Sequence, residues 1–270
     1  MELFEKDIWG NPIKPYTRSL LADDFIEPPF SVLNGRNQSR RWTQRKNSWM
    51  SLLPKLSEEY EGDYKLGSVF DPVLCEIMYT WFCRPGRRIL DPFAGGPIRG
   101  MVALTMGYDY YGIELRQAQV EYNKSLCNGV YVSGDAYQLV KDAPESDFIF
   151  SCPPYGDLEV YSNDLKDLST MSYDRFIDRY NSIILSTVSR LKGDYAAFVV
   201  GNYRDSNGYY YNFVGDTIRA FENAGMRLYN DIIYLTPIGS AFMRAKKFFT
   251  ATKKVVKVHQ NILVFKKGDK

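Results

Sequence analysis

The sequence from position 87 reads Arg87-Arg88-Ile89-Leu90-Asp91-Pro92-Phe93-Ala94-Gly95-Gly96. Its first half predicts a short apolar strand that ends at Asp91, and its second half predicts a glycine-bearing turn at 94–96. A helix is expected to follow near Arg99 to Met106. Open α/β sheets bind nucleotides where such a turn leaves the carboxyl end of a strand. We therefore expect a ligand of that kind at this turn.

Strands and helices alternate on both sides of the turn. Apolar runs predict six further strands, at 110–113, 130–133, 148–151, 195–200, 227–235 and 260–265. Helical spacing, caps and chain breakers predict helices at 71–82, 117–126, 172–191 and 214–223. This alternation indicates an α/β fold with a mainly parallel sheet over residues 67–270. Residues 1–66 lack sustained periodicity and are predicted to form an irregular arm with short helices, a possible DNA contact.

The composition excludes several kinds of chemistry. The chain has 270 residues, 45% hydrophobic and 24% charged, which is ordinary for a globular protein with one large domain. Its cysteines, Cys75, Cys83, Cys127 and Cys152, form no Cys-x-x-Cys pair and are expected to be reduced thiols. His259 is the only histidine, which argues against a zinc site and against Ser-His-Asp or Cys-His catalysis. We therefore expect no metal ion.

The N-terminal sequence predicts a cytoplasmic location. Residues 1–14 carry acidic side chains and Trp9 where a secretory signal would need a basic start and an apolar stretch. No apolar run approaches the length that spans a membrane, so no membrane partner is expected.

Two basic stretches, 36–46 and 244–257, are candidate nucleic-acid contacts. The net charge of +2 is too small to indicate a polyanionic partner by itself. Both stretches nevertheless lack acids and carry aromatic residues among their cations, which favours DNA backbone contact over an ordinary solvated surface. The candidate contacts to double-stranded DNA are Arg36, Arg40, Arg41, Arg45, Lys46, Arg244, Lys246 and Lys247.

Acidic residues at predicted strand ends favour S-adenosylmethionine as the ligand of the glycine turn. The turn lacks both the Lys-Ser/Thr of a phosphate-binding loop and the Gly-x-Gly-x-x-Gly of a dinucleotide site. S-adenosylmethionine has no phosphate, and its ammonium and ribose hydroxyls call for acids. We expect Asp91 to face the ammonium, Glu114 to bind the ribose hydroxyls, and Asp135 to accept from the adenine amino group.

A second motif, Phe150-Ser151-Cys152-Pro153-Pro154-Tyr155, ends the fourth predicted strand. Its two prolines fix an extended turn that cannot continue the sheet. A Pro-Pro-Tyr sequence alone is more often an ordinary turn. This one follows an apolar strand, the cofactor turn and the third acid, so we interpret it as a candidate catalytic loop. The polar segment 156–172 is expected to close over the substrate.

The two motifs resemble those of the DNA amino-methyltransferases, which act on N6 of adenine or N4 of cytosine. The run from Asp91 to Gly96 is similar to their cofactor motif, and the run from Cys152 to Tyr155 is similar to their catalytic motif of Asp, Asn or Ser followed by Pro-Pro-Tyr/Phe. Further stretches resemble a compact group of phage and prophage DNA methylases, namely 28–33, 70–75, 157–162, 212–218 and 259–265.

The resemblance implies a Rossmann-like methyltransferase fold, with a mainly parallel seven-stranded sheet and an antiparallel final strand. It also implies the cytoplasm of a bacterial host if the chain is encoded by a phage or prophage. The implied catalytic residues are Cys152, Pro153, Pro154 and Tyr155. The residues expected to bind S-adenosylmethionine are Asp91, Pro92, Phe93, Ala94, Gly95, Gly96, Glu114, Leu115, Asp135, Ala136 and Ser151.

The implied reaction is direct methyl transfer to an exocyclic amine of a base extruded from the duplex. Position 152 and the carbonyl oxygen of Pro153 would accept the amine hydrogens, while Tyr155 would stack on the base. The sequence departs from the family at two positions. Pro97 replaces a third glycine, and Cys152 replaces a stronger acceptor. Because a thiol accepts hydrogen bonds weakly, the carbonyl oxygen of Pro153 is expected to contribute more to binding the amine hydrogens. Because Cys152 resembles Ser in size and neutrality, cytosine N4 is slightly favoured over adenine N6. The alternatives are an RNA or protein-glutamine methyltransferase, which would usually carry Asn at 152, and an inactive DNA-binding homologue.

Overall fold

A computed structural model describes residues 25–36, 40–53, 69–158, 160–239 and 241–268. The chain divides into two compact units, residues 1–30 and 31–270. In the described part of the first unit, Phe30 N donates to the carbonyl oxygen of Pro28 at 2.7 Å. Most of the sequence-predicted arm (1–24, 37–39 and 54–66) lies outside the described residues.

The division at 30/31 differs from the predicted boundary at 66/67 because two elements of the arm belong to the larger unit. Strand β1 (Val32–Asn34) joins the central sheet, and helix α2 (Arg40–Leu52) packs on helix α3 (Pro72–Phe82). Two buried tryptophans of α2 carry this contact. The indole nitrogen of Trp42 donates to Asp71 at 3.2 Å, and that of Trp49 donates to Glu76 at 2.5 Å.

The described strands form one eight-stranded sheet in the order β1-β7-β8-β6-β5-β2-β3-β4. After β1 they are β2 (Arg88–Asp91), β3 (Asp109–Glu114), β4 (Val130–Ser133), β5 (Ser146–Ser151), β6 (Leu191–Val200), β7 (Met226–Leu235) and β8 (His259–Lys267). Strand β8 is antiparallel to β6 and β7, and all other neighbouring pairs are parallel. The expected mainly parallel sheet with an antiparallel final strand is confirmed.

The expected count of seven strands is wrong, because β1 adds an eighth at the edge of the sheet. It pairs in parallel with β7, with Val32 opposite Ile233 and Asn34 opposite Leu235. A strand of three residues is too short to show an alternating or apolar pattern in the sequence. Its existence depends on β7, which is far away along the chain.

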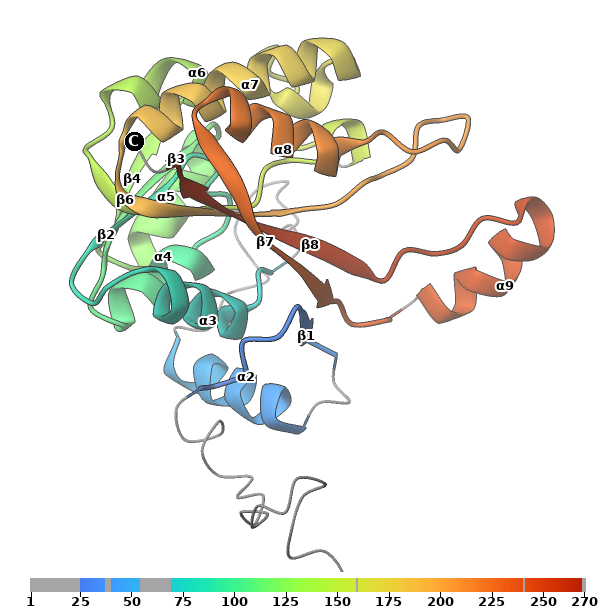
Figure 1. The fold of residues 1–270 in the computed structure, drawn as a ribbon, viewed down its shortest axis with the longest axis horizontal. Helices are drawn as coiled ribbons and strands as arrows, with labels where there is room; N and C mark the ends of the chain where they lie inside the picture. The colour runs from blue at the N-terminus through green and yellow to red at the C-terminus, as the bar shows by residue number, and fades with distance from the viewer. Residues whose placement is uncertain (1–24, 37–39, 54–68, 159, 240, 269–270) are drawn as a thin grey trace, which may run out of the picture. The chain divides into compact units, whose positions relative to one another are not determined.

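Helices cover both faces of the sheet, with α7 and α8 over one face and α3 and α4 over the other (Figure 1). The remaining bounds are α4 (Ile98–Thr105), α5 (Gln117–Leu126), α6 (Ala136–Leu139), α7 (Tyr173–Ser189), α8 (Phe213–Asn223) and α9 (Ala241–Thr252), with 3-10 turns η1 (Val140–Asp142), η2 (Gly156–Leu158) and η3 (Leu168–Thr170). The predicted helices correspond to α3, α4, α5, α7 and α8.

Local sequence explains where these elements begin and how they pack. Asp71 caps α3 by accepting from Val73 N at 3.0 Å, and Pro72 occupies the first turn, where no amide hydrogen is needed. In α7, apolar residues recur at helical spacing and are buried against the sheet. Strand β2 lies between β3 and β5 in the sheet. The chain continues from β2 to β3 on one side and from β5 to β6 on the other, and this reversal of direction leaves a crevice at the carboxyl ends of β2 and β5.

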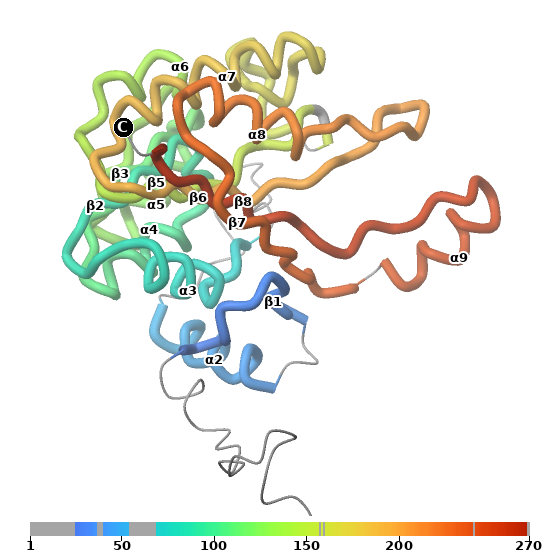
Figure 2. The backbone as a smooth tube through the Cα atoms, viewed as in Figure 1, coloured from blue at the N-terminus to red at the C-terminus, as the bar shows by residue number. Residues whose placement is uncertain are grey.

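The connection from β7 to β8 carries α9 away from the sheet (Figure 2). The side chains from Phe242 to Thr252 are exposed, and this helix was not predicted from the sequence. Across the described ranges, no helix has both the length and the apolar character needed to cross a membrane.

Candidate active site

A cavity of about 710 Å³ opens at the carboxyl ends of β2, β3 and β5, and it brings the two sequence motifs together. The predicted cofactor and catalytic residues that line it are Pro92, Phe93, Gly95, Gly96, Glu114, Leu115, Asp135, Ala136, Cys152, Pro153, Pro154 and Tyr155. Three others, Asp91, Ala94 and Ser151, are fully buried and do not line it. Among the predicted DNA contacts, Lys46 lines it.

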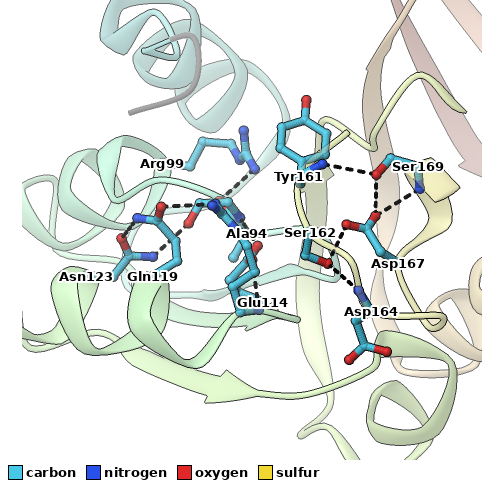
Figure 3. A network of polar contacts seen from close by, with 12 residues as sticks. Ala94, Arg99, Glu114, Gln119, Asn123, Tyr161, Ser162, Asp164, Asp167 and Ser169 are labelled. Carbon is cyan, nitrogen blue, oxygen red and sulfur yellow. Dashed lines mark hydrogen bonds and ion pairs between the residues drawn. The ribbon is translucent and has the colours of Figure 1, made fainter. Parts of the chain in front are cut away.

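The glycine turn is fixed by side chains from β3 and α5 (Figure 3). Gly95 has a φ of +51°, a left-handed conformation that favours glycine. Its amide donates to the Glu114 carboxylate at 3.1 Å, and its carbonyl oxygen accepts from Asn123 Nδ2 at 2.8 Å. Gln119 supports Asn123 with a bond of 2.9 Å. The turn is therefore held in place by the protein itself.

Asp91 is the buried centre of the site rather than part of its surface. Its carboxylate accepts from Arg99 Nε at 2.6 Å, Tyr110 Oη at 2.7 Å and Ser151 Oγ at 2.5 Å. The expectation that Asp91 faces a ligand ammonium therefore does not match its surroundings, because its oxygens are directed to these protein donors. Sequence position identified the strand end, but it could not show which way the carboxylate turns.

Arg99, which lines the cavity, takes the position next to Asp91. Burial is the largest single effect and lowers the pKa of Arg99, but the Asp91 carboxylate, together with Tyr110 and Cys152, raises that pKa overall. Its Nη2 donates to the carbonyl oxygens of Phe93 at 2.6 Å and Ala94 at 2.9 Å. The guanidinium also lies over the ring of Phe70, 4.7 Å from the centroid. Arg99 thus links α4 to the glycine turn as a fixed cation.

Glu114 and Asp135 both line the cavity, and both also bond to the protein. Glu114 accepts from Arg116 N at 3.0 Å and Arg116 Nε at 3.1 Å, besides the Gly95 amide. Asp135 caps α6 by accepting from Tyr137 N at 3.0 Å and forms an ion pair with Arg179. Each carboxylate is therefore held in place at a strand end by donors of the protein.

The Cys152–Tyr155 loop follows β5, and its tyrosine is tightly positioned. The Tyr155 hydroxyl accepts from Gln260 Nε2 at 2.6 Å and donates to the carbonyl oxygen of Val199 at 3.4 Å. The Tyr203 ring lies nearly parallel to that of Tyr155, at 12° and 6.5 Å between centroids. Burial raises the pKa of Tyr155, which keeps the phenol neutral.

The far wall of the cavity comes from α2, α3 and β7. Asp71 is buried there and accepts from Lys46 Nζ at 3.0 Å and from Tyr234 Oη at 3.2 Å, besides Trp42. Lys46, Asp71, Tyr234 and Gln260 all line the cavity. Apart from Lys46, this wall was not predicted from the sequence, because its residues are brought together by the packing of α2 on α3 and by the pairing of β7 with β8.

Residues of the segment 156–172 form part of the cavity lining. Leu158, Tyr161 and Leu168 contribute to the lining. Asp167 organises the segment by accepting from Ser162 Oγ at 2.8 Å and from Ser169 Oγ at 2.6 Å (Figure 3). The segment thus borders the space that it was expected to cover.

The predicted DNA contacts lie on two separate helices, except for Arg36, which follows β1. Arg40, Arg41 and Arg45 lie on α2, where Arg45 forms an ion pair with Glu76. The exposed cations of α9, Arg244, Lys246 and Lys247, form none of the ion pairs found among the described residues. Within the described ranges, no cluster of three or more His, Cys, Asp or Glu side chains could hold a metal ion.

No protein-family model and no curated protein matches the chain. Among solved structures, a candidate RNA methyltransferase from Pyrococcus horikoshii is 16% identical, with a TM-score of 0.52 over 84% of this chain and 100% of that chain. TrmN from Thermus thermophilus is 17% identical, with a TM-score of 0.48 over 74% of this chain and 49% of that chain, so this chain spans about half of TrmN. A magnesium protoporphyrin IX methyltransferase from Synechocystis PCC 6803, with bound SAM, is 11% identical, with a TM-score of 0.46 over 73% and 79%. The first likeness shows that the chain has the Rossmann-like methyltransferase fold.

Proposed function

We propose that the chain transfers a methyl group from S-adenosylmethionine to an exocyclic amino group of a base extruded from double-stranded DNA. One observation carries the proposal: the glycine turn at 94–96 and the Cys152–Tyr155 loop line the same cavity. The choice of DNA follows from the resemblance of these motifs to DNA amino-methyltransferases. The size and neutrality of Cys152 favour cytosine N4 over adenine N6.

The residues around the glycine turn fit S-adenosylmethionine, which supplies an electrophilic methyl group when bound. A Cβ built on Gly96 would meet nothing within 4 Å, so the cavity side of the turn is open. We assign the ribose hydroxyls to Glu114, which lines the cavity at the end of β3. Among the described residues none accepts from Arg99 Nη1, and we assign this donor to the methionine carboxylate.

Replacing Asp135 with Ala is expected to weaken binding of S-adenosylmethionine about tenfold or more, because we assign this carboxylate to the adenine amino group. Asp135→Asn is the matched control. Asparagine also caps helices and keeps one side-chain acceptor, so most of the affinity should remain. Titration calorimetry measures both variants, and an Ala variant that binds as tightly as the wild type would refute the role.

The catalytic loop is assigned to the target amine. Cys152 Sγ and the carbonyl oxygen of Pro153 accept its two hydrogens, so that the nitrogen lone pair is no longer held in the ring system and can attack the methyl group. As the nitrogen–carbon bond forms, the bond between the methyl carbon and the sulfonium sulfur would break and leave S-adenosylhomocysteine, and the methylated nitrogen would then lose one proton to solvent. Tyr155 stacks on the base, and its ring is kept in place by Gln260 and Tyr203. Alignment of amine and methyl supplies much of the rate.

The exposed cations of α2 and α9 are assigned to the DNA backbone. Arg40 and Arg41 are exposed on α2, and Arg244, Lys246 and Lys247 are exposed on α9. Each such side chain that meets a phosphate releases counterions, which makes binding depend on salt. Arg45 and Lys46 already pair with Glu76 and Asp71, so we assign no phosphate contact to them, and Lys46 belongs to the lining of the cavity instead.

The experiment that tests the proposal offers labelled S-adenosylmethionine and three acceptors, duplex DNA, RNA and protein, to the purified chain. Label is expected in DNA. Label confined to RNA or protein would contradict the proposed substrate. Binding of the cofactor without transfer to any acceptor would identify an inactive homologue.

A further inference from the structure

The connection between β6 and α8 forms an ordered hairpin at residues 203–211. Arg204 and Tyr210 form an antiparallel bridge. Asp205 N donates to the carbonyl oxygen of Tyr209 at 2.8 Å, and Tyr209 N donates back to the Asp205 carboxylate at 2.8 Å. Gly208 supplies the left-handed turn, with a φ of +93°, and its carbonyl oxygen accepts from Arg204 Nη1 at 2.6 Å. These bonds give the hairpin one fixed shape.

The hairpin displays an aromatic side chain at its tip. Tyr209 is 76% exposed, although its backbone is bonded on both sides. The ring of the next residue, Tyr210, lies under the Arg204 guanidinium, 3.9 Å from the centroid. A single exposed aromatic residue is common on protein surfaces. Here, however, it stands on a rigid support, so little conformational entropy would be lost when it binds.

The base of the hairpin rests on the proposed catalytic loop. Tyr203, its first residue, stacks near Tyr155, and the Tyr203 hydroxyl lies against Gly156. Tyr211, its last residue, stacks on Tyr173 with 4.0 Å between centroids and 10° between planes. A ligand bound at the tip of the hairpin would therefore be held by a support that packs directly beside the cavity that receives the substrate.

A basic segment borders the hairpin. Residues 236–258 contain six Lys and Arg and no acid. The Lys254 side chain lies against Gly208, and Lys257 Nζ donates to the carbonyl oxygen of Asn202 at 3.3 Å. Figure 2 shows the hairpin and the α9 connection leaving the sheet on the same side. A polyanion drawn to this segment would meet Tyr209.

We propose that Tyr209 is a wedge that enters the DNA duplex and stacks in the space left by the extruded base. The inference rests on the proposed function. An extruded base leaves its neighbours without a stacking partner, and an inserted aromatic ring restores that contact. The cations of 236–258 would hold the phosphates that flank the gap. The partner is duplex DNA, because the proposed substrate is DNA and only a duplex has a base stack for the ring to enter. Tyr209 thus favours extrusion, whereas Tyr155 acts on the base once it has arrived.

The test compares transfer of labelled methyl to duplex DNA and to the same DNA after heat denaturation. Tyr209→Ala is expected to lower the rate on duplex DNA about tenfold, because base–aromatic stacking is lost. Its rate on denatured DNA should equal that of the wild type, since an unpaired base needs no wedge. Tyr209→Trp should keep the wild-type rate on both. Equal rates of Tyr209→Ala and wild type on duplex DNA, or an equal loss on both substrates, would overturn the proposal.

Two controls separate this result from other failures. Tyr229→Ala removes another exposed tyrosine, 57% exposed on β7, and should change neither rate. Replacing Arg244, Lys246 and Lys247 with Ala should weaken duplex binding and flatten its salt dependence, while Tyr209→Ala should keep the wild-type salt slope. A wild type that uses duplex but not denatured DNA would also overturn the wedge. A wild type that methylates neither would instead refute the proposed function.

Discussion

Tyr155→Ala is expected to lower the methyl transfer rate by about a hundredfold or more while S-adenosylmethionine still binds. The ring lines the cavity beside Cys152 and Pro153, where the target base must be aligned with the methyl group. Small displacements of a reacting group can cost about a hundredfold in rate. The glycine turn is held by Glu114 and Asn123 instead, so the cofactor end should remain intact.

Tyr155→Phe is the matched variant for this prediction. It keeps the ring but loses the hydrogen bonds with Gln260 and Val199, so a smaller loss of about tenfold or less is expected. Single-turnover transfer and equilibrium binding of labelled cofactor measure the two effects separately. Undiminished transfer by the Ala variant would be decisive against the assignment of Tyr155, and so would an equal loss of cofactor binding.

Arg99→Met is expected to destabilise the protein by about 3–5 kcal/mol, because it leaves the Asp91 carboxylate buried without its cation. Side-chain exposure is 7% for Arg99 and 0% for Asp91, so water cannot replace the lost partner. Each kcal/mol corresponds to roughly 2–4 °C in Tm for a domain near this size. The melting temperature should therefore fall by about 6–20 °C.

The double variant Asp91→Asn with Arg99→Met is the control. Removing both charges should recover part of the lost stability, since a neutral amide at position 91 can still bond to Tyr110 and Ser151. Thermal unfolding by circular dichroism measures both proteins. A single variant that melts with the wild type, or a double variant that melts below the single one, would show that the pair is not a buried ion pair of this kind.

Much of the fold could be predicted because its signals are local. The apolar run that ends at Asp91 and the glycines at 95 and 96 identified the central strand and its turn. The apolar positions of α7 recur at helical spacing and proved to be its buried face. Strand β1 and helix α9 could not be predicted in the same way. The strand is three residues long, and the helix exposes nearly every side chain.

The same distinction between local and long-range signals applies to the site. Its two motifs could be recognised because each follows a predicted strand directly, and the structure brings both to one cavity. What the sequence could not give is the direction of each side chain. Asp91 turns inward to Arg99, and Gln260 reaches Tyr155 from a strand 105 positions away. Asn123 and Gln119 carried a weak local signal, as amides four residues apart on one helix.

The most direct test of the central claim is the identity of the methylated product. Duplex DNA treated with the purified protein and S-adenosylmethionine is digested to nucleosides and analysed by mass spectrometry. We expect N4-methylcytosine, and its yield should disappear with Tyr155→Ala. If N6-methyladenine is found instead, the assignment of an amino-methyltransferase site would stand, and only the preference for cytosine would be wrong. Methylation at a ring carbon, or no methylated nucleoside from a protein that binds the cofactor, would contradict an active site built on Cys152–Tyr155.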